Sequence, residues 1–251
     1  RLVGFAHILV FIAICAALQA PILVRNINHY DTAQLTSQSG AHSLLWIAPL
    51  VLEASDGTPH AEGVRRMQAR YMQEIGGVEP DNPFERSSLM SATAWRAISD
   101  LGFGATAKAW LIGGAINLFS PATVLSPPVS SLPRTGFYDM AGDSKVEKLI
   151  AFLFRNDNPT YAWILLLSFL ALLALRVAQF WGLASGLLGQ TSQEARLILA
   201  FLMLWVLYIL LVNGPIASPK YRLPIEPLSA ISAAFAFVAT RDWLHRRRPR
   251  Q

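Results

Sequence analysis

The sequence predicts an all-α fold, a polytopic transmembrane helical protein with amphipathic extracytoplasmic helices. Of its 251 residues, 53% are hydrophobic and 15% are charged, and the mean hydropathy is +0.38. This balance is typical of multi-span membrane proteins rather than of soluble domains. Several apolar runs are long enough to cross a hydrocarbon core of about 30 Å. Between these runs lie segments whose apolar residues recur with helical spacing, which predicts amphipathic helices.

Residues 2–23 form the first predicted transmembrane span. The run is too long for the core of a signal peptide and has no clear cleavage pattern. Pro21 and Arg25 close it. Cys15, which lies inside it, is the only cysteine, so an intramolecular disulfide and a cysteine metal site are excluded. Because the chain starts with Arg1 and is apolar at once, we expect it to be the C-terminal part of a longer protein.

Residues 24–159 are predicted to be an extracytoplasmic loop region that carries short amphipathic helices. Its first part, residues 25–46, is rich in turn-forming and hydrogen-bonding residues and predicts irregular chain. Thr58 and the proline after it predict the start of a helix. The apolar face of that helix consists of Val64, Met67, Tyr71 and Ile75.

Two further capped helices are predicted in this region. Asn82 followed by Pro83 predicts a start. The apolar stripe of that helix consists of Met90, Ala94, Ile98 and Leu101. Ser144 begins a capping box for the other helix. Its apolar face consists of Val146, Leu149, Ile150 and Leu153.

A short apolar segment and a proline-rich segment lie between these two helices. Residues 103–119 form an apolar run that is short for a transmembrane span, and the run includes Lys108 and Asn117. We therefore expect a re-entrant or short membrane helix there. Residues 120–133 are rich in proline and predict a loop.

Residues 160–251 are predicted to hold the C-terminal transmembrane helices, about three spans, and a basic cytoplasmic tail. The last span is rich in small residues that favour close helix packing in lipid, namely Ser229, Ala230, Ser232, Ala233 and Ala234.

The tail at 241–250 has five of its ten positions occupied by arginine, three of them consecutive. Such a tail is able to bind nucleic acid, but beside an apolar span it more simply marks the cytoplasmic end. We therefore expect no nucleic-acid partner, and we expect Lys220 and Arg222 on the extracytoplasmic side.

The polar break NGPIASPKYRLPIEP at 213–227 holds the candidate binding residues. Pro219 and Pro224 favour extended geometry in the residues before them. In an extended segment Lys220 and Arg222 share one side, with Tyr221 on the other. Pro224 then suits the first turn of the next helix. Two cations beside a helix N-terminus at a membrane surface are suited to hold a phosphate or another anion. The ordinary alternative is that they only anchor the flanking helices.

Other chemistry has little support. The sequence has no Gly-rich phosphate loop, no HExxH pair and no Cys/His cluster, so we expect no cofactor and no metal. His29, His42 and His60 are spread through the loop region, which does not favour a metal site. Asp139 and Asp143 are spaced as a carboxylate pair, but a solvated turn explains them better.

Two segments resemble polyprenyl-phosphate-dependent membrane glycosyltransferases. PILVRNINHYDTAQLTSQSG at 21–40 resembles the place where a span of those enzymes ends in a Pro-x-x-x-Arg-Asn turn. SPKYRLPIEPLSAISA at 218–233 resembles the Arg-Tyr-Arg-x-Pro-x-x-Pro element before their last span, with Lys220 in place of the more usual first arginine. These are GT-C class enzymes of the protein-mannosyltransferase and aminoarabinose-transferase type. The resemblance covers both ends of the chain and is weak in its middle.

The resemblance implies transfer of a hexosyl or pentosyl group from a polyprenyl-phosphate-linked sugar donor to an extracytoplasmic glycan, lipid or protein acceptor. It implies a multi-pass protein of the bacterial cytoplasmic (inner) membrane, in contact with membrane lipids. The substrate-binding residues that it implies are Lys220, Tyr221, Arg222, Arg25 and Asn26. In that family the catalytic carboxylate lies in the first extracytoplasmic loop, near the N-terminus. Nothing here matches that loop, Asp31 included, so we expect the catalytic residue to be absent from this part.

Two other functions compete with this interpretation. A non-enzymatic transporter or lipid-linked-sugar flippase component would favour ionisable residues inside the spans. The predicted spans are almost uncharged, and Arg176 is expected at an edge, which favours the enzyme. A structural or assembly subunit would need no cationic pocket.

Overall fold

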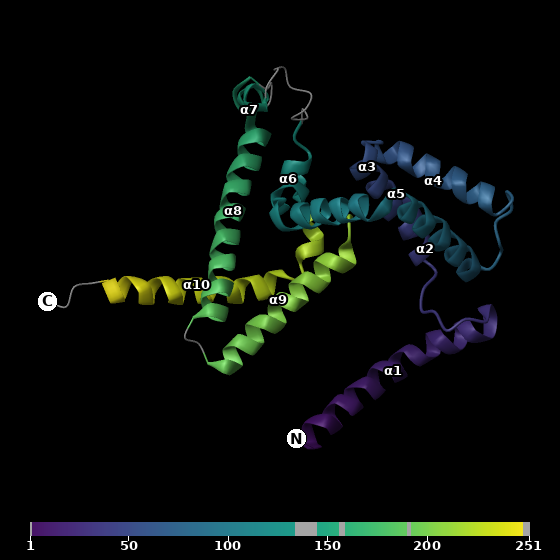
Figure 1. Ribbon diagram of the computed structural model, residues 1–251, viewed down its shortest axis with the longest axis horizontal. Helices are drawn as coiled ribbons and strands as arrows, with labels where there is room; N and C mark the ends of the chain where they lie inside the picture. The colour runs from purple at the N-terminus through teal and green to yellow at the C-terminus, as the bar shows by residue number, and fades with distance from the viewer. Residues whose placement is uncertain (1, 134–144, 156–158, 190–191, 248–251) are drawn as a thin grey trace. The chain divides into compact units, whose positions relative to one another are not determined.

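The computed structural model describes residues 2–133, 145–155, 159–189 and 192–247 (Figure 1). Within these ranges the regular secondary structure is entirely helical, which confirms the predicted all-α class. Three of the described helices contain segments long and apolar enough to cross a membrane, namely Ala6–Tyr30, Pro159–Leu188 and Gln193–Asn213. The chain is therefore a helical membrane protein. It divides into two compact units, Arg1–Ala109 and Trp110–Gln251, and each is described by itself.

The first unit begins with α1 (Leu2–Tyr30), which continues past the predicted span. Pro21 lies inside this helix and does not end it. A proline removes one backbone hydrogen bond, and apolar spans tolerate this loss. The turn predicted at Arg25 and Asn26 is therefore wrong, because both residues are helical. The helix ends instead at Tyr30, and Asp31 directly after it has a φ of 52°. Large apolar side chains along α1 are exposed, as expected of a surface that faces lipid.

The remaining helices of the first unit pack on one another. They are α2 (Ser39–His42), the π-helical turn η1 (Ser43–Ile47), α3 (Ala48–Asp56), α4 (His60–Glu74) and the first part of α5 (Pro83–Phe119). Helix thus begins at Ser39, within the stretch predicted to be irregular. The cause is a tertiary contact, because the Gly40 backbone N–H donates to Ser87 Oγ of α5 over 2.9 Å. Local propensity alone does not show that contact.

The amphipathic faces predicted for α4 and α5 are confirmed in part, since Val64, Ile75, Met90 and Leu101 are only half-buried. Met67 and Tyr71 of α4 are buried, as are Ala94 and Ile98 of α5. The predicted cap of α5 is present too, since Asn82 Oδ1 accepts a hydrogen bond from the Phe84 backbone N–H over 2.9 Å. The start of α4 lies slightly later than predicted, with Pro59 rather than Thr58 at the N-cap position. The α5 helix is interrupted at Gly102, whose φ of 82° is not helical.

The second unit contains the rest of the described chain. After the end of α5 come η2 (Ala122–Leu125), α6 (Pro127–Ser130), α7 (Lys145–Phe154), α8 (Pro159–Leu188), α9 (Gln193–Asn213), η4 (Pro219–Arg222) and α10 (Glu226–Arg247). The stretch predicted as a Pro-rich loop thus includes two single-turn helices. The predicted capping residue Ser144 and the pair Asp139 and Asp143 lie outside the described residues.

Helices α8 and α10 cross in close contact (Figure 1). A Cβ added at Gly182 of α8 would lie 1.7 Å from the Ser232 carbonyl oxygen of α10. Only a glycine allows the two backbones to approach this closely. Ser232 belongs to the predicted run of small residues, so part of that run packs as expected. Helix α10 is not among the described helices that meet the length and apolarity of a span, so a third C-terminal span stays a prediction.

Candidate anion-binding site

The segment that holds the predicted cations is not extended. Residues Pro219–Arg222 form a short 3-10 helix, η4. Lys220 is exposed, whereas Arg222 is only 6% exposed, so the two side chains do not share a side. The prediction fails because the φ that proline fixes suits a helical turn as well as an extended strand. Pro224 also precedes α10, and Pro227 occupies its first turn instead.

Asn117 near the end of α5 holds this segment in place. Its side chain is fully buried. Nδ2 donates to the Ile216 carbonyl oxygen over 3.0 Å, and Oδ1 accepts from the Ser218 backbone N–H over 2.8 Å. A buried amide that satisfies two loop groups fixes the loop, because breaking either bond leaves a polar group without water. The position of η4 thus depends on a residue about a hundred positions earlier in the chain.

Arg222 belongs to a charge cluster with Arg176 and Glu226. Its Nε lies 2.6 Å from Glu226 Oε1. Arg176 Nη2 contacts the same carboxylate oxygen over 2.9 Å. Arg222 Nη1 also donates to the Ser120 carbonyl oxygen over 2.5 Å. The cluster therefore joins α8, η4 and the first turn of α10.

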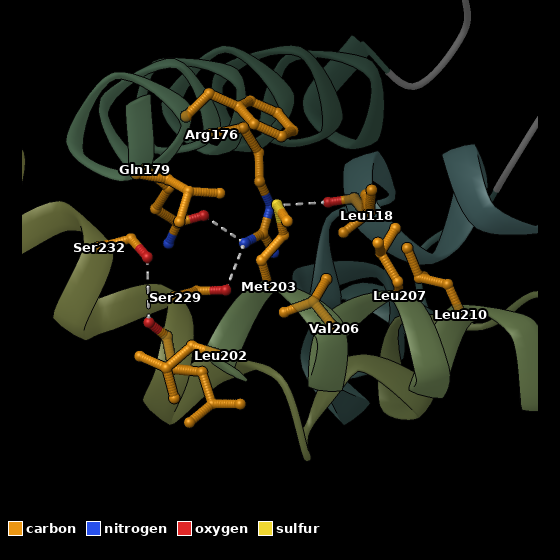
Figure 2. Close-up of a pocket in the computed structure, with 13 residues that line it drawn as sticks. Leu118, Arg176, Gln179, Leu202, Met203, Val206, Leu207, Leu210, Ser229 and Ser232 are labelled. Atoms are coloured by element: carbon orange, nitrogen blue, oxygen red, sulfur yellow. Dashed lines mark hydrogen bonds between the residues drawn. The ribbon is translucent and has the colours of Figure 1, made fainter. Parts of the chain in front are cut away.

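Arg176 lies well inside α8, with more than ten helical residues on either side. The expectation that it marks the edge of a span is therefore wrong. Its side chain is only 3% exposed. Nε donates to the Leu118 carbonyl oxygen over 3.0 Å and Nη1 to Gln179 Oε1 over 2.5 Å, as Figure 2 shows. A buried ionisable residue inside an apolar helix is costly, and such residues commonly mark a functional site.

The charge cluster has an excess of positive charge. It contains two guanidinium groups and one carboxylate. Burial lowers the pKa of the Arg222 guanidinium, Glu226 raises it and Arg176 lowers it. An arginine has so high a pKa that it still keeps its proton at neutral pH. The N-terminus of α10 adds a partial positive charge to the same place.

An apolar cavity of about 350 Å³ adjoins the charge cluster (Figure 2). Arg176, Gln179 and Ser229 form its polar wall. The rest is lined mainly by the apolar side chains of α8, α9 and α10, namely Phe180, Leu183, Leu202, Met203, Val206, Leu207, Leu210 and Leu228. An apolar cavity with a cation at one wall complements an amphiphile that has an anionic head and an apolar tail.

The other predicted site residues have local roles. Arg25 and Asn26 lie in the first unit, where Arg25 Nη2 donates to Asn26 Oδ1 over 2.8 Å. Asn26 is fully buried, and its Nδ2 donates to the Gln34 carbonyl oxygen over 2.6 Å. Asn26 thus holds the chain that follows α1. In the second unit Lys220 Nζ lies 5.1 Å from the centroid of the Tyr221 ring.

The structure adds residues that the sequence interpretation missed. Glu226 is not among the predicted site residues, although its spacing of four from Arg222 is typical of a helical ion pair. Arg176 is expected at the edge of a span, although an arginine within a long apolar run is itself a signal of a functional site. Gln179 and Ser229 had no signal in the sequence, because their role depends on where Arg176 lies.

The described residues contain no group of three or more His, Cys, Asp or Glu side chains that would suit a metal ion. The fold and the charge cluster define an integral-membrane protein with a buried cationic site beside an apolar cavity. No protein-family model, curated protein or solved structure matches the chain.

Proposed function

We propose that the protein is part of a membrane glycosyltransferase that moves a sugar from a polyprenyl-phosphate carrier to an extracytoplasmic glycan, lipid or protein. The proposal rests on the buried positive charge of Arg176, which lines an apolar cavity, and of Arg222, which shares the Glu226 carboxylate with it. A polyprenyl phosphate has the two matching parts, an anionic head and an isoprenoid tail. The resemblance of residues 218–233 to the GT-C class supports the same carrier. The proposed location is the bacterial inner membrane.

The cations have a chemical role in such a transfer. In the donor the phosphate is a diester with one negative charge. When the sugar leaves, the phosphate becomes a monoester and gains a second charge. Preorganised cations in a site shielded from water stabilise charge that develops in the transition state. In this proposal Arg176 and Arg222 stabilise the leaving phosphate, and the exposed Lys220 attracts the head group from outside.

Sugar transfer from a polyprenyl-phosphate donor tests this role. The comparison uses the complete enzyme, catalytic carboxylate included, as wild type, Arg222→Lys and Arg222→Ala in membranes, at equal expression and with thermal stability checked. A charge-assisted hydrogen bond is worth roughly 1.5–3 kcal/mol, so each variant is expected to lose about tenfold or more in rate. Arg155→Ala, at an exposed arginine in the same unit, is the control and keeps the wild-type rate. Wild-type rates in both Arg222 variants would refute the role.

One observation favours a second candidate, a transporter or lipid-linked-sugar flippase component. Arg176 is buried inside α8, and such residues commonly mark transport paths. The two functions leave different products. A transferase releases the carrier phosphate from the sugar, whereas a flippase moves the intact sugar carrier between leaflets. Chromatography of the labelled lipid after incubation of the complete enzyme in proteoliposomes therefore detects the transferase, because only transfer separates the sugar from the carrier.

A further inference from the structure

We infer that Glu226 is a built-in competitor for the anionic head group. Its carboxylate occupies the position between Arg176 and Arg222 that the carrier phosphate takes, and binding displaces it. This inference rests on the proposed function and concerns regulation of the same site.

The two arginines share a single oxygen of Glu226, so neither guanidinium forms a two-point contact with the carboxylate. Arg176 Nη2 and Arg222 Nε both contact Oε1 of Glu226, over 2.9 and 2.6 Å. An arginine fork pairs best with two oxygens of one anion. Two forks that converge on one carboxylate oxygen are therefore poorly matched to it. A phosphate monoester offers three non-bridging oxygens and a diester offers two, so either is able to give each guanidinium its own acceptor.

The charge balance favours a phosphate as well. The carboxylate supplies one negative charge to two buried guanidinium groups. A phosphate monoester, which is the form of the carrier after the sugar has left, carries about −1.5 to −2 at neutral pH. Exchange of Glu226 for this monoester therefore removes most of the buried excess charge, whose cost in a low-dielectric site is high.

The cationic position does not depend on Glu226. Each arginine also donates a hydrogen bond to a backbone carbonyl group. Leu118 accepts from Arg176 Nε, and Ser120 accepts from Arg222 Nη1. The arginine side chains are 3% and 8% exposed, whereas the Glu226 side chain is 34% exposed. Glu226 is thus the outward-facing member of the charge cluster. It is free to turn outward while the two guanidinium groups stay in place.

The test uses farnesyl phosphate and farnesol, which share a tail and differ in the phosphate. Their affinities are measured by native mass spectrometry for the purified protein in detergent. Glu226→Gln is expected to bind farnesyl phosphate about tenfold more tightly than wild type, because the competing charge is gone. Farnesol binding is expected to stay unchanged. Glu194→Gln, in the first turn of α9 as Glu226 is in that of α10, is the matched control and behaves as wild type.

The outcomes separate this inference from the proposed function. If wild type prefers farnesyl phosphate and Glu226→Gln binds it equally or less tightly, the competitor role is wrong and the carrier site stands. If wild type binds both lipids equally, the carrier site and the competitor role both fail.

Thermal unfolding is the second measurement, for the case in which Glu226→Gln is unstable without ligand. At a fixed concentration, a ligand that binds only the folded state raises the unfolding temperature more when it binds more tightly. Farnesyl phosphate is therefore expected to raise the unfolding temperature of Glu226→Gln more than that of wild type. An equal or smaller rise, or an equal rise with farnesol, would overturn the inference.

Discussion

Arg176 in the middle of α8 forms an ion pair with Glu226 in the first turn of α10, with 2.9 Å between Nη2 and Oε1. The pair joins an apolar helix to the segment that carries Lys220 and Arg222. Because Arg176 also donates to the Leu118 carbonyl oxygen, the same side chain connects α10 to the end of α5. The charge cluster is thus part of the packing of the second unit as well as a candidate binding site.

Arg176→Met is expected to destabilise the protein by about 1–3 kcal/mol. The methionine has nearly the same length, but it leaves the half-buried Leu118 carbonyl and the buried Gln179 amide without their donor. Thermal unfolding of the purified protein in detergent measures this loss. Arg155→Met is the control at an exposed position and is expected to unfold as wild type does. Equal unfolding temperatures for the two variants would show that Arg176 contributes nothing to packing.

Gly182→Ala is expected to separate α8 from α10. The added Cβ would lie 1.7 Å from the Ser232 carbonyl oxygen, and a backbone atom cannot move aside cheaply. Overpacking of this kind costs about 1–3 kcal/mol or more. Gly114→Ala is the matched control, because nothing lies within 4 Å of its added Cβ. It is expected to be neutral or slightly stabilising, as alanine is the better helix former. Gly182→Ala with wild-type stability would contradict the close crossing.

Glu74 of α4 predicts a pH-dependent stability in the first unit. Partial burial raises its pKa, but hydrogen bonds from Arg96, Thr93 and Arg70 lower it more, to about 2 from a usual value of 4.5. A lowered pKa stabilises the folded state above the unfolded pKa, and this contribution is lost as the pH falls through the folded pKa.

Glu74→Gln is therefore expected to lose about 1–2 kcal/mol of stability at neutral pH, after allowance for partial exposure. The difference from wild type should shrink as the pH falls from 4.5 to 2. Unfolding at several pH values checks this, with the exposed Glu53→Gln as control. A difference that stays constant through that window would mean that the charge of Glu74 does not stabilise the fold.

The sequence predicted those parts of the fold that depend on local pattern. The buried faces of Met67 and Tyr71 in α4 follow from helical spacing, and the Asn82 cap follows from residue type. The conformation of residues 219–222 did not follow, because proline permits both an extended and a helical turn. Asn117 and Ser120 decide between them, and both lie about a hundred residues away.

In the candidate site, too, the features set by local sequence were predictable and those set by distant contacts were not. Arg222 is identified from its neighbours in the sequence, but its basic neighbour Lys220 is exposed and does not belong to the charge cluster. The burial of Arg222 was not predictable, because Arg176 and the Ser120 carbonyl group belong to distant segments. The parallel arrangement of Lys220 and Arg222 was wrong for the same reason. Glu226 was accessible to sequence reasoning through its spacing from Arg222.

The basic tail predicts the topology of the C-terminal region. Clusters of arginine beside a span favour the cytoplasmic side, so Gln251 is expected in the cytoplasm and Lys220 outside it. Reporter fusions after Gln251 and within residues 214–220 are expected to give opposite signals. Matching signals would place both ends of α10 on one side of the membrane.

The most direct test of the central claim is the selectivity of the charge cluster for a phosphate head. Equilibrium binding of farnesyl phosphate and of farnesol is compared in wild type, Arg222→Lys and Arg222→Ala. We predict that wild type binds farnesyl phosphate at least about tenfold more tightly than farnesol, which corresponds to about 1.4 kcal/mol. Both variants should lose this preference, since lysine cannot reproduce the planar fork of arginine. Equal affinity for the two lipids in wild type, or an undiminished preference in Arg222→Lys and Arg222→Ala, would contradict the account and leave Arg222 a structural anchor.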